Sequence, residues 1–338
     1  MRFGLLLSGP FPGDYDPSEM YQQTCKQAQI ATENNFEGLF TAQHLLSGPA
    51  AAMLHPLLLL SNLATHAPGL YLGTAVFLLP LHHPVAVAEQ TATLDIISGG
   101  KFLFGVGQGY RDVEFRSFGL EKRHRRQRME EGLQVIRKLW AEDDVSFNGQ
   151  FFQLDGVTMS PKPLQQPGPP IFIGADTLKS VPRVPEVGDH WIVSRRHSKS
   201  FLRQAVPAYR AALEGKGKEF KGLFMFRDLC VAGSTREAEE RVQEAYERMY
   251  QVYHRWGQPG ERYDQDFDEL KRERLIVGTP EEVYEQVMAY HQEFGVEFMS
   301  FTVYWPGMNP PWTLETIQLF GEKVIPQVKR ATPVSLLP

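Results

Sequence analysis

Residues 70–106 read LYLGTAVFLLPLHHPVAVAEQTATLDIISGGKFLFGV and contain one strand–helix–strand unit. The apolar run Leu70–Leu79 predicts a buried strand, and Val85–Ile97 has the length and apolar spacing of a helix. Ser98-Gly99-Gly100 can end that helix because glycine tolerates positive φ, and Lys101–Val106 predicts the next strand. A helix that connects two strands favours parallel pairing.

The same alternation extends in both directions along the chain. Further strands are predicted over Arg2–Leu7, Phe36–Ala42, Pro169–Gly174, His190–Ser194, Gly222–Val231 and Glu297–Tyr304. Helices are predicted over Ser18–Asn34, Pro56–Ala67 and Arg125–Glu142. Eight strands separated by helices, without a long antiparallel run, favour an α/β fold that closes into a (β/α)₈ TIM barrel.

We expect one domain over residues 1–330 and a C-terminal tail over 331–338. Two segments are additional to the pattern of one helix after each strand, and we interpret both as insertions into the barrel. Residues 143–166 predict a loop or small hairpin, and residues 235–274 predict helix. Thr279-Pro280-Glu281-Glu282 fits a capping box that begins another helix.

Composition excludes several classes of protein. The chain has 338 residues, 42% of them hydrophobic, and a formal net charge of −5, so it has material for a large core and no general attraction to nucleic acid or anionic membranes. The first apolar run is too short for a signal peptide, and the stretch around Leu57–Leu60 is far shorter than the ~20 residues that span a bilayer. Cys25 and Cys230 share no motif. These features predict a cytoplasmic protein with free thiols.

Chemistry in a TIM barrel lies in the loops after the strands. His44 follows the second predicted strand and is either an acid or base near neutral pH or a hydrogen-bonded structural histidine. His82 and His83 would point to opposite sides of an extended chain, so we expect no metal site there. The loop Gly105–Arg111 lets backbone approach an anion or a flat ring, but its glycine spacing is not that of a dinucleotide-binding motif.

Two segments are candidates for binding a phosphate. The basic run over residues 122–128 begins the predicted helix Arg125–Glu142, where basic side chains oppose the helix dipole. A bound phosphate would explain this placement, and a solvated surface run is the alternative. The fifth predicted strand leads into residues 174–180, GADTLKS, whose hydroxyls and amides could bind phosphate beside a following helix. Alternatively, Asp176 or Thr177 caps that helix.

Together these segments resemble the bacterial luciferase-like monooxygenase family. The matching blocks span about residues 1–180 and 275–328. They include residues 72–76, 80–85, 89–95, 98–102, 105–109, 116–119, 130–133, 161–163, 170–175, 277–283 and 294–296. The stretch between the two matching regions carries no pattern that we can place.

The resemblance implies a dimeric (β/α)₈ barrel that binds reduced flavin at the carboxyl ends of its strands. It places a non-proline cis peptide at Ala75–Val76 beneath the flavin ring, and the turn Gly107-Gln108-Gly109 along the flavin. His44 matches a histidine that is important for catalysis in luciferase. The residues that would surround the flavin phosphate are Arg126 (or its neighbour Arg125), Ala175, Asp176, Thr177 and Ser180, just beyond Gly174.

The sequence also departs from luciferase. Luciferase has Glu-His-His where this chain has Gln43-His44-Leu45, so the carboxylate neighbour is missing. Gly107 replaces a reactive cysteine, and Gln108 replaces an arginine. These differences argue against light emission and aldehyde oxidation, whereas they leave the barrel and the phosphate site unaffected.

We therefore predict a two-component monooxygenase. A separate reductase would supply reduced FMN, and the chain would use it with O₂ to oxygenate a small organic substrate. His44 would transfer a proton near the flavin, and Phe77, Leu79 and aromatic residues near Trp305 would form a dry pocket. The alternatives are an F420-dependent dehydrogenase or reductase and a non-catalytic flavin-binding protein. A metal-dependent hydrolase would need a His-x-His pair that the sequence lacks.

Overall fold

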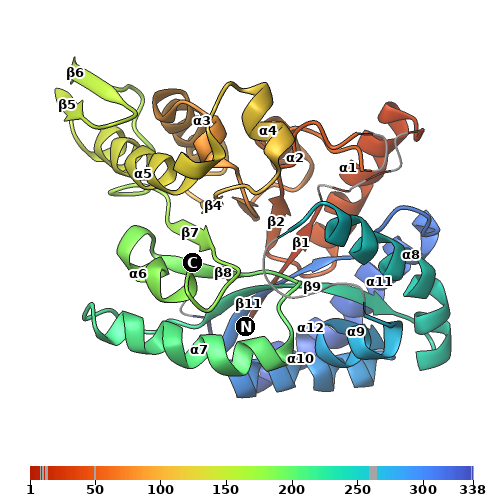
Figure 1. Ribbon diagram of the computed structural model, residues 1–338. Helices are drawn as coiled ribbons and strands as arrows, with labels where there is room; N and C mark the ends of the chain where they lie inside the picture. The colour runs from red at the N-terminus through yellow and green to blue at the C-terminus, as the bar shows by residue number, and fades with distance from the viewer. Residues whose placement is uncertain are drawn as a thin grey trace.

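Parallel strands form a closed barrel at the centre of the molecule (Figure 1). The computed structural model describes residues 1–7, 9, 11, 14–48, 51–258, 265–335 and 337. Among them, the barrel strands in order around the ring are β1 (Arg2–Leu6), β2 (Gly38–Thr41), β3 (Tyr71–Thr74), β4 (Phe102–Val106), β7 (Ile171–Gly174), β8 (His190–Val193), β9 (Leu223–Val231) and β11 (Val296–Thr302). Pairing of β8 with β9 and of β11 with β1 closes the ring, so the predicted (β/α)₈ barrel is confirmed.

Helices surround the strands (Figure 1). They are α1 (Pro17–Glu33), α2 (Pro56–His66), α3 (Pro84–Ile97), α4 (Asp112–Ser117), α5 (Arg125–Ala141), α6 (Val184–Val187), α7 (Lys199–Glu214), α8 (Thr235–Arg255), α9 (Phe267–Glu273), α10 (Pro280–Phe294), α11 (Pro310–Leu319) and α12 (Ile325–Ala331). The predicted capping box is present, since the Thr279 hydroxyl accepts from the amide of Glu282 and the Glu282 carboxylate accepts from the amide of Thr279. No helix in the described ranges combines the length and apolarity that a membrane crossing requires.

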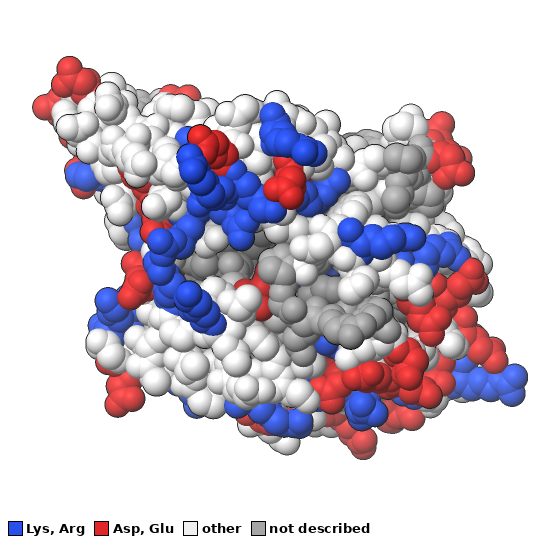
Figure 2. Space-filling model, in the orientation of Figure 1, with Lys and Arg blue, Asp and Glu red and all other residues white. Residues whose placement is uncertain are grey.

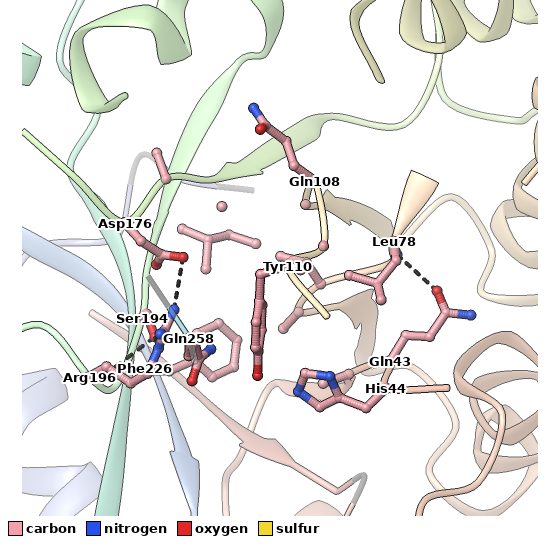
Figure 3. Close-up of a pocket in the computed structure, with 18 of the residues that line it drawn as sticks. Gln43, His44, Leu78, Gln108, Tyr110, Asp176, Ser194, Arg196, Phe226 and Gln258 are labelled. Carbon is pink, nitrogen blue, oxygen red and sulfur yellow. Dashed lines mark hydrogen bonds and ion pairs between the residues drawn. The ribbon is translucent and has the colours of Figure 1, made fainter. Parts of the chain in front are cut away.

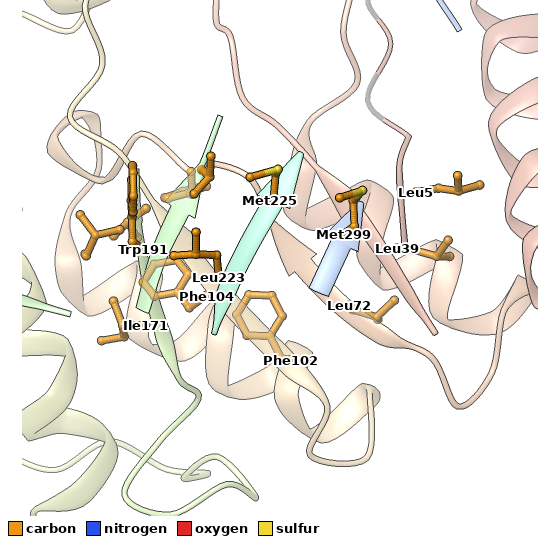
Figure 4. Packing of buried hydrophobic residues seen from close by; sticks show 14 of the residues in the cluster. Leu5, Leu39, Leu72, Phe102, Phe104, Ile171, Trp191, Leu223, Met225 and Met299 are labelled. Carbon is orange, nitrogen blue, oxygen red and sulfur yellow. The ribbon is translucent and has the colours of Figure 1, made fainter. Parts of the chain in front are cut away.

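The core has two layers because successive residues of a strand face opposite sides of the sheet. Inside the barrel, the Phe40 ring lies 4.8 Å from that of Phe224. Gly38 and Gly73 make room for Phe40, since a Cβ there would lie 2.9 Å and 2.5 Å from its ring atoms. Outside the barrel, the strands present a second apolar layer to the helices. Figure 4 shows Leu5, Leu39, Leu72 and Met299 of this layer on neighbouring strands.

The third strand is shorter than predicted. The apolar run predicts a strand over Leu70–Leu79, whereas β3 ends at Thr74. The chain then passes through a cis peptide and forms a short 3₁₀ turn over Leu79–Leu81, with Phe77 making an isolated bridge to Val106. An apolar run predicts burial but does not reveal where ladder hydrogen bonds stop, so the strand prediction was too long.

Both predicted insertions have regular structure. Residues 143–166 contain the antiparallel hairpin β5 (Val145–Asn148) and β6 (Gln153–Val157), which projects from the barrel (Figure 1). Residues 235–274 form α8 and α9, as predicted, although 259–264 lie outside the described residues. The sequence prediction missed β10 (Leu275–Gly278), which pairs with the end of β9 outside the ring. This strand is additional to the eight-strand alternation on which the prediction was based.

The chain ends pack together at the barrel. In the predicted tail, the amino group of Met1 donates to Thr332 Oγ1 at 2.9 Å and to the carbonyl of Pro333 at 3.2 Å. Leu337 is 1% exposed and packs with the phenylalanines inside the barrel. Residues 336 and 338 of this tail lie outside the described residues.

Candidate active site

A cavity opens at the carboxyl ends of the barrel strands. The predicted site residues that line it are His44, Ala75, Val76, Gly107, Gln108, Gly174, Ala175, Asp176, Thr177 and Ser180. Its empty space, counted to the open mouth, is about 1250 Å³.

The Ala75–Val76 peptide on the cavity wall is cis, as the family resemblance predicts. Backbone hydrogen bonds hold it from both sides. The amide of Ala75 donates to the carbonyl of Thr41 at 2.7 Å, and the amide of Gln43 donates to the carbonyl of Val76 at 3.1 Å. The amide of Phe77 donates to the carbonyl of Gly105 at 2.8 Å. These bonds to the segments around β2 and β4 fix the peptide in one position.

Two glycines flank the Val76 side chain. A Cβ on Gly107 would lie 2.5 Å from Val76 Cγ2, and a Cβ on Gly174 would lie 3.2 Å from Val76 Cγ1. Any side chain at Gly107 would therefore displace Val76. The three residues, from β3, β4 and β7, form a smooth apolar bed across one wall of the cavity. A planar ring system fits such a bed, which agrees with the glycine role in close ligand approach.

One end of the cavity offers groups suited to a phosphate. The hydroxyls of Thr177 and Ser180 lie 2.9 Å apart, and each accepts from the other residue's amide at 3.0–3.1 Å. Arg125, the first residue of α5, also lines the cavity. Within the described ranges, no carboxylate forms an ion pair with Arg125. Two hydroxyls and a guanidinium on the wall of one cavity are the kinds of donor that phosphate prefers.

Arg126 does not line the cavity, so the structure favours Arg125 over the predicted Arg126. Adjacent helical residues point about 100° apart, and Arg126 is consequently exposed. The helix expected after Ser180 is also reduced to a 3₁₀ turn over Val181–Arg183 and the four-residue α6. Such a short element has little dipole, so the hydroxyls, the amides and Arg125 are the groups that remain for a phosphate.

Asp176 lines the cavity, but its carboxylate is already paired (Figure 3). Arg196 Nη2 lies 2.8 Å from Oδ2, and His197 Nε2 lies 3.3 Å from Oδ1. Burial opposes ionisation, yet Arg196 and His197 together lower the pKa of Asp176 to about 2. An ionised carboxylate repels a phosphate, so the Asp176 side chain does not fit the predicted phosphate contact. It holds the loop after β8 instead.

A carboxylate from a distant part of the sequence lies near His44. Glu114 of α4 is fully buried, and its Oε1 lies 3.8 Å from His44 Nδ1. The same oxygen accepts from the amide of Leu45 at 3.0 Å and from Arg111 at 3.3 Å. Burial lowers the pKa of His44, and Glu114 partly offsets this effect. The imidazole is therefore neutral at pH 7 and can accept a proton at the cavity wall.

The family profile described as luciferase-like monooxygenase matches residues 1–297. The chain belongs to this family. Two curated relatives of this luciferase-like monooxygenase are similar over about half of their own length. The oxygenase component of flavin-dependent trigonelline monooxygenase from Acinetobacter baylyi is 31% identical over 52% of this chain and 49% of that protein. The FMNH₂-dependent dimethylsulfone monooxygenase from Pseudomonas putida is 30% identical over 58% and 54%.

Solved structures of similar proteins have the same fold. Monooxygenase RslO1 from Streptomyces bottropensis superposes with a TM-score of 0.87 and 26% sequence identity, covering 97% of this chain and 100% of that one. Relatives named for the deazaflavin F420 also match. Membership of this family thus rests on the profile match, and the solved structures agree with it in fold.

Several cavity residues of this luciferase-like monooxygenase escaped the sequence analysis. They are Tyr110, Arg195, Arg196, Tyr253 and Gln258. Arg195 and Arg196 directly follow the predicted strand His190–Ser194, and Tyr110 lies in the loop after the predicted strand Lys101–Val106, so inspecting each strand end for polar residues would have found them. Tyr253 lies inside α8, where no sequence signal marks it. The predicted apolar wall also differs, because Leu78 lines the cavity whereas Phe77 and Leu79 pack behind it.

The histidine pair of this luciferase-like monooxygenase has packing roles. His82 stacks on Phe77 with ring centroids 4.3 Å apart, and burial, aided by His55, lowers the pKa of His82 to about 4. His83 caps α3 by accepting from the amide of Val85 at 3.4 Å. The described part of the chain contains no cluster of three residues that could hold a metal ion.

Proposed function

We propose that the chain is the oxygenase of a two-component monooxygenase that uses reduced FMN and O₂ to oxygenate a small organic substrate. The observation that carries this proposal is the bed formed by Val76 between Gly107 and Gly174, with Arg125, Thr177 and Ser180 at its end. A flat ring and a phosphate fit these two features. The names of the FMNH₂-dependent relative and of the oxygenase component support the same cofactor and the same division of labour.

Bound reduced flavin would supply the electrons for oxygen reduction, and the protein residues would control the surroundings. Leu6, Leu78, Ile192 and Phe226 line the cavity and exclude water from the reacting centre. Neutral His44 can accept a proton, and Glu114 stabilises the imidazolium that results. His44 therefore holds or returns one proton at the edge of the cavity during turnover.

Positive charge around the cavity suits an anionic cofactor that arrives from solution. Figure 2 shows Lys and Arg side chains gathered over α4, the start of α5 and α6, beside a hollow in this face. Those segments and their adjoining loops carry Arg116, Lys122, Arg123, Arg125, Arg126, Lys179 and Arg183. A basic rim raises the local concentration of an anionic ligand, and its effect falls with ionic strength. We further propose a separate flavin reductase as FMN donor and a homodimeric assembly, as the family resemblance predicts.

An anaerobic titration with reduced FMN and reduced F420, followed by oxygen uptake, tests the proposed function. We expect tight binding of reduced FMN and a change in the rate or products of its reaction with O₂ relative to free reduced FMN. Selective binding of F420, without any effect on the oxidation of reduced FMN, would replace the proposal by an F420-dependent dehydrogenase. Binding of FMN without any change in the rate or products of its oxidation would indicate a non-catalytic flavin-binding protein.

A further inference from the structure

Arg195 is a cation at the cavity for which the described residues supply no carboxylate in an ion pair. It follows β8, and its Nη2 donates to the Tyr253 hydroxyl at 2.9 Å while Nη1 donates to Thr302 Oγ1 at 3.4 Å. Its guanidinium carbon lies 4.4 Å from the ring centroid of Trp305 and 5.2 Å from that of Tyr253. These aromatic contacts fix the guanidinium in place. Within the described ranges, no carboxylate forms an ion pair with it.

The neighbouring carboxylate Asp228 does not fill this gap. Its Oδ2 accepts from the Tyr250 hydroxyl at 2.8 Å, and its Oδ1 accepts from Trp305 Nε1 at 3.1 Å. Trp305 thus contacts both Asp228 and Arg195. Burial raises the pKa of Asp228 and the charge of Arg195 opposes this effect, so the two groups interact at a distance without forming an ion pair. A partly buried cation without an ion partner is costly, so a ligand anion would complete this site.

Arg125 and the guanidinium of Arg195 are held at different strands of the barrel. Arg125 precedes α5, between β4 and β7, whereas Arg195 reaches Thr302 at the end of β11. In the ring of eight strands, the β4–β7 side faces the β11–β1 side. The phosphate proposed for Arg125 therefore leaves Arg195 for a second anionic group at another part of the cavity.

The surroundings of Arg195 suit an aromatic ligand with a polar group. The Tyr110 hydroxyl is buried without a hydrogen-bond partner among the described residues, and burial raises the pKa of Tyr110, so it remains a donor. In Figure 3 the Tyr110 ring lies between His44 and Gln258. The His44 ring lies 5.9 Å from that of Tyr110 and 6.0 Å from that of Tyr253. The Tyr253 ring adjoins the guanidinium, and the rings of His44 and Tyr110 continue from Tyr253 along the same cavity.

We propose that Arg195 is a specificity-determining residue that binds a carboxylate of the substrate, and that the substrate is an aromatic carboxylic acid. The Tyr110 hydroxyl donates a second hydrogen bond to this substrate, and the rings of Tyr110, Tyr253 and His44 contact its aromatic body. His44 then lies beside the bound substrate as well as beside the flavin bed. This inference rests on the proposed oxygenase function, since it assigns the second part of the same cavity.

The experiment compares matched acids and amides. Benzoate, 4-hydroxybenzoate and 2-naphthoate, each beside its primary amide, are titrated against the FMN-loaded protein by calorimetry. Wild type should bind at least one acid about tenfold or more tightly than its amide, the scale of a charged hydrogen bond. Arg195→Met should abolish this preference, Arg195→Lys should retain part of it, and Tyr110→Phe should weaken acid and amide alike. Arg236→Met, a charge loss on the exposed face of α8, should leave the preference intact.

Two outcomes would overturn the inference. One is that no acid in the panel binds more tightly than its amide. The other is that Arg195→Met keeps the acid preference but weakens FMN binding, which would make Arg195 a flavin contact. FMN binding and the unfolding midpoint of each variant are measured in parallel, and Arg195→Lys replaces Arg195→Met if the latter does not fold. Failure of the proposed function is distinguishable, because the acid preference would then persist while the protein left the rate and products of reduced-FMN oxidation unchanged.

Discussion

Arg125→Met should weaken binding of reduced FMN through loss of its phosphate contact. A hydrogen bond to a charged group contributes about 1.5–3 kcal/mol. Arg125 is partly exposed, so solvent screening places the effect near the lower end, at about 1.5–2 kcal/mol. This corresponds to a roughly 10- to 30-fold rise in Kd. Arg126→Met is the matched control, because Arg126 carries the same charge one residue away without lining the cavity.

The assay is an anaerobic titration monitored by flavin fluorescence, carried out with reduced FMN and with reduced riboflavin. Riboflavin lacks the phosphate, so its affinity should be the same for wild type and Arg125→Met. Arg126→Met should change FMN affinity less than about threefold, and only at low salt, where long-range attraction acts. Equal losses for the two variants, or an equal loss for riboflavin, would refute the assignment of Arg125 to the phosphate.

Three further predictions concern the bed, the histidine and the paired aspartate. Gly107→Ala places a Cβ 2.5 Å from Val76 Cγ2, so it should weaken FMN binding more than Gly174→Ala, whose Cβ would lie 3.2 Å from Val76 Cγ1. Titration of both variants with reduced FMN checks this order. Equal effects would contradict the proposal that the flavin ring lies against Val76. His44→Gln should lower turnover by roughly 10²–10⁴-fold while FMN affinity stays unchanged, since the residue acts on protons. Burial lowers the pKa of His44 and Glu114 partly offsets this, so wild-type turnover should fall only below the ordinary pKa of histidine, about 6.5. Glu114→Gln removes the offset and should move this acidic limb of the pH profile to lower pH. A shift to higher pH would exclude His44 as the titrating group. Asp176→Asn should destabilise the fold by about 2 kcal/mol at neutral pH. The pKa of Asp176 in the folded protein is about 2, below its ordinary 3.8. The stability difference between wild type and Asp176→Asn is therefore full above pH 4 and disappears as the pH falls toward 2. Urea unfolding of both proteins at pH 7 and pH 3 measures it, and a difference that does not change with pH would contradict the pairing with Arg196.

The barrel could be predicted because its signals are local. Each strand and helix shows its own period, and Ser98-Gly99-Gly100 and Thr279–Glu282 mark helix ends through backbone chemistry that depends on neighbouring residues alone. The cis peptide at Ala75–Val76 came from the family resemblance, since the apolar pattern by itself predicted an uninterrupted strand.

The parts of the site that escaped prediction depend on contacts between distant residues. Glu114 lies beside His44 in the fold although 70 positions separate the two residues in the sequence. It lies on the short helix α4, which no sequence pattern indicated. Whether Arg125 or Arg126 faces the cavity depends on the residue at which the 3₁₀ turn Lys122–His124 ends and α5 begins. A start one residue earlier or later would rotate the other arginine toward the cavity. Arg195 meets Tyr253 only after α8 folds back over the cavity.

The measurement that tests the central claim most directly is a crystal structure of the protein soaked with FMN. The account predicts the isoalloxazine ring against Val76, between Gly107 and Gly174, and the phosphate within hydrogen-bond distance of Arg125, Thr177 and Ser180. A phosphate bound at Arg195, or a ring bound away from the Ala75–Val76 peptide, would contradict it.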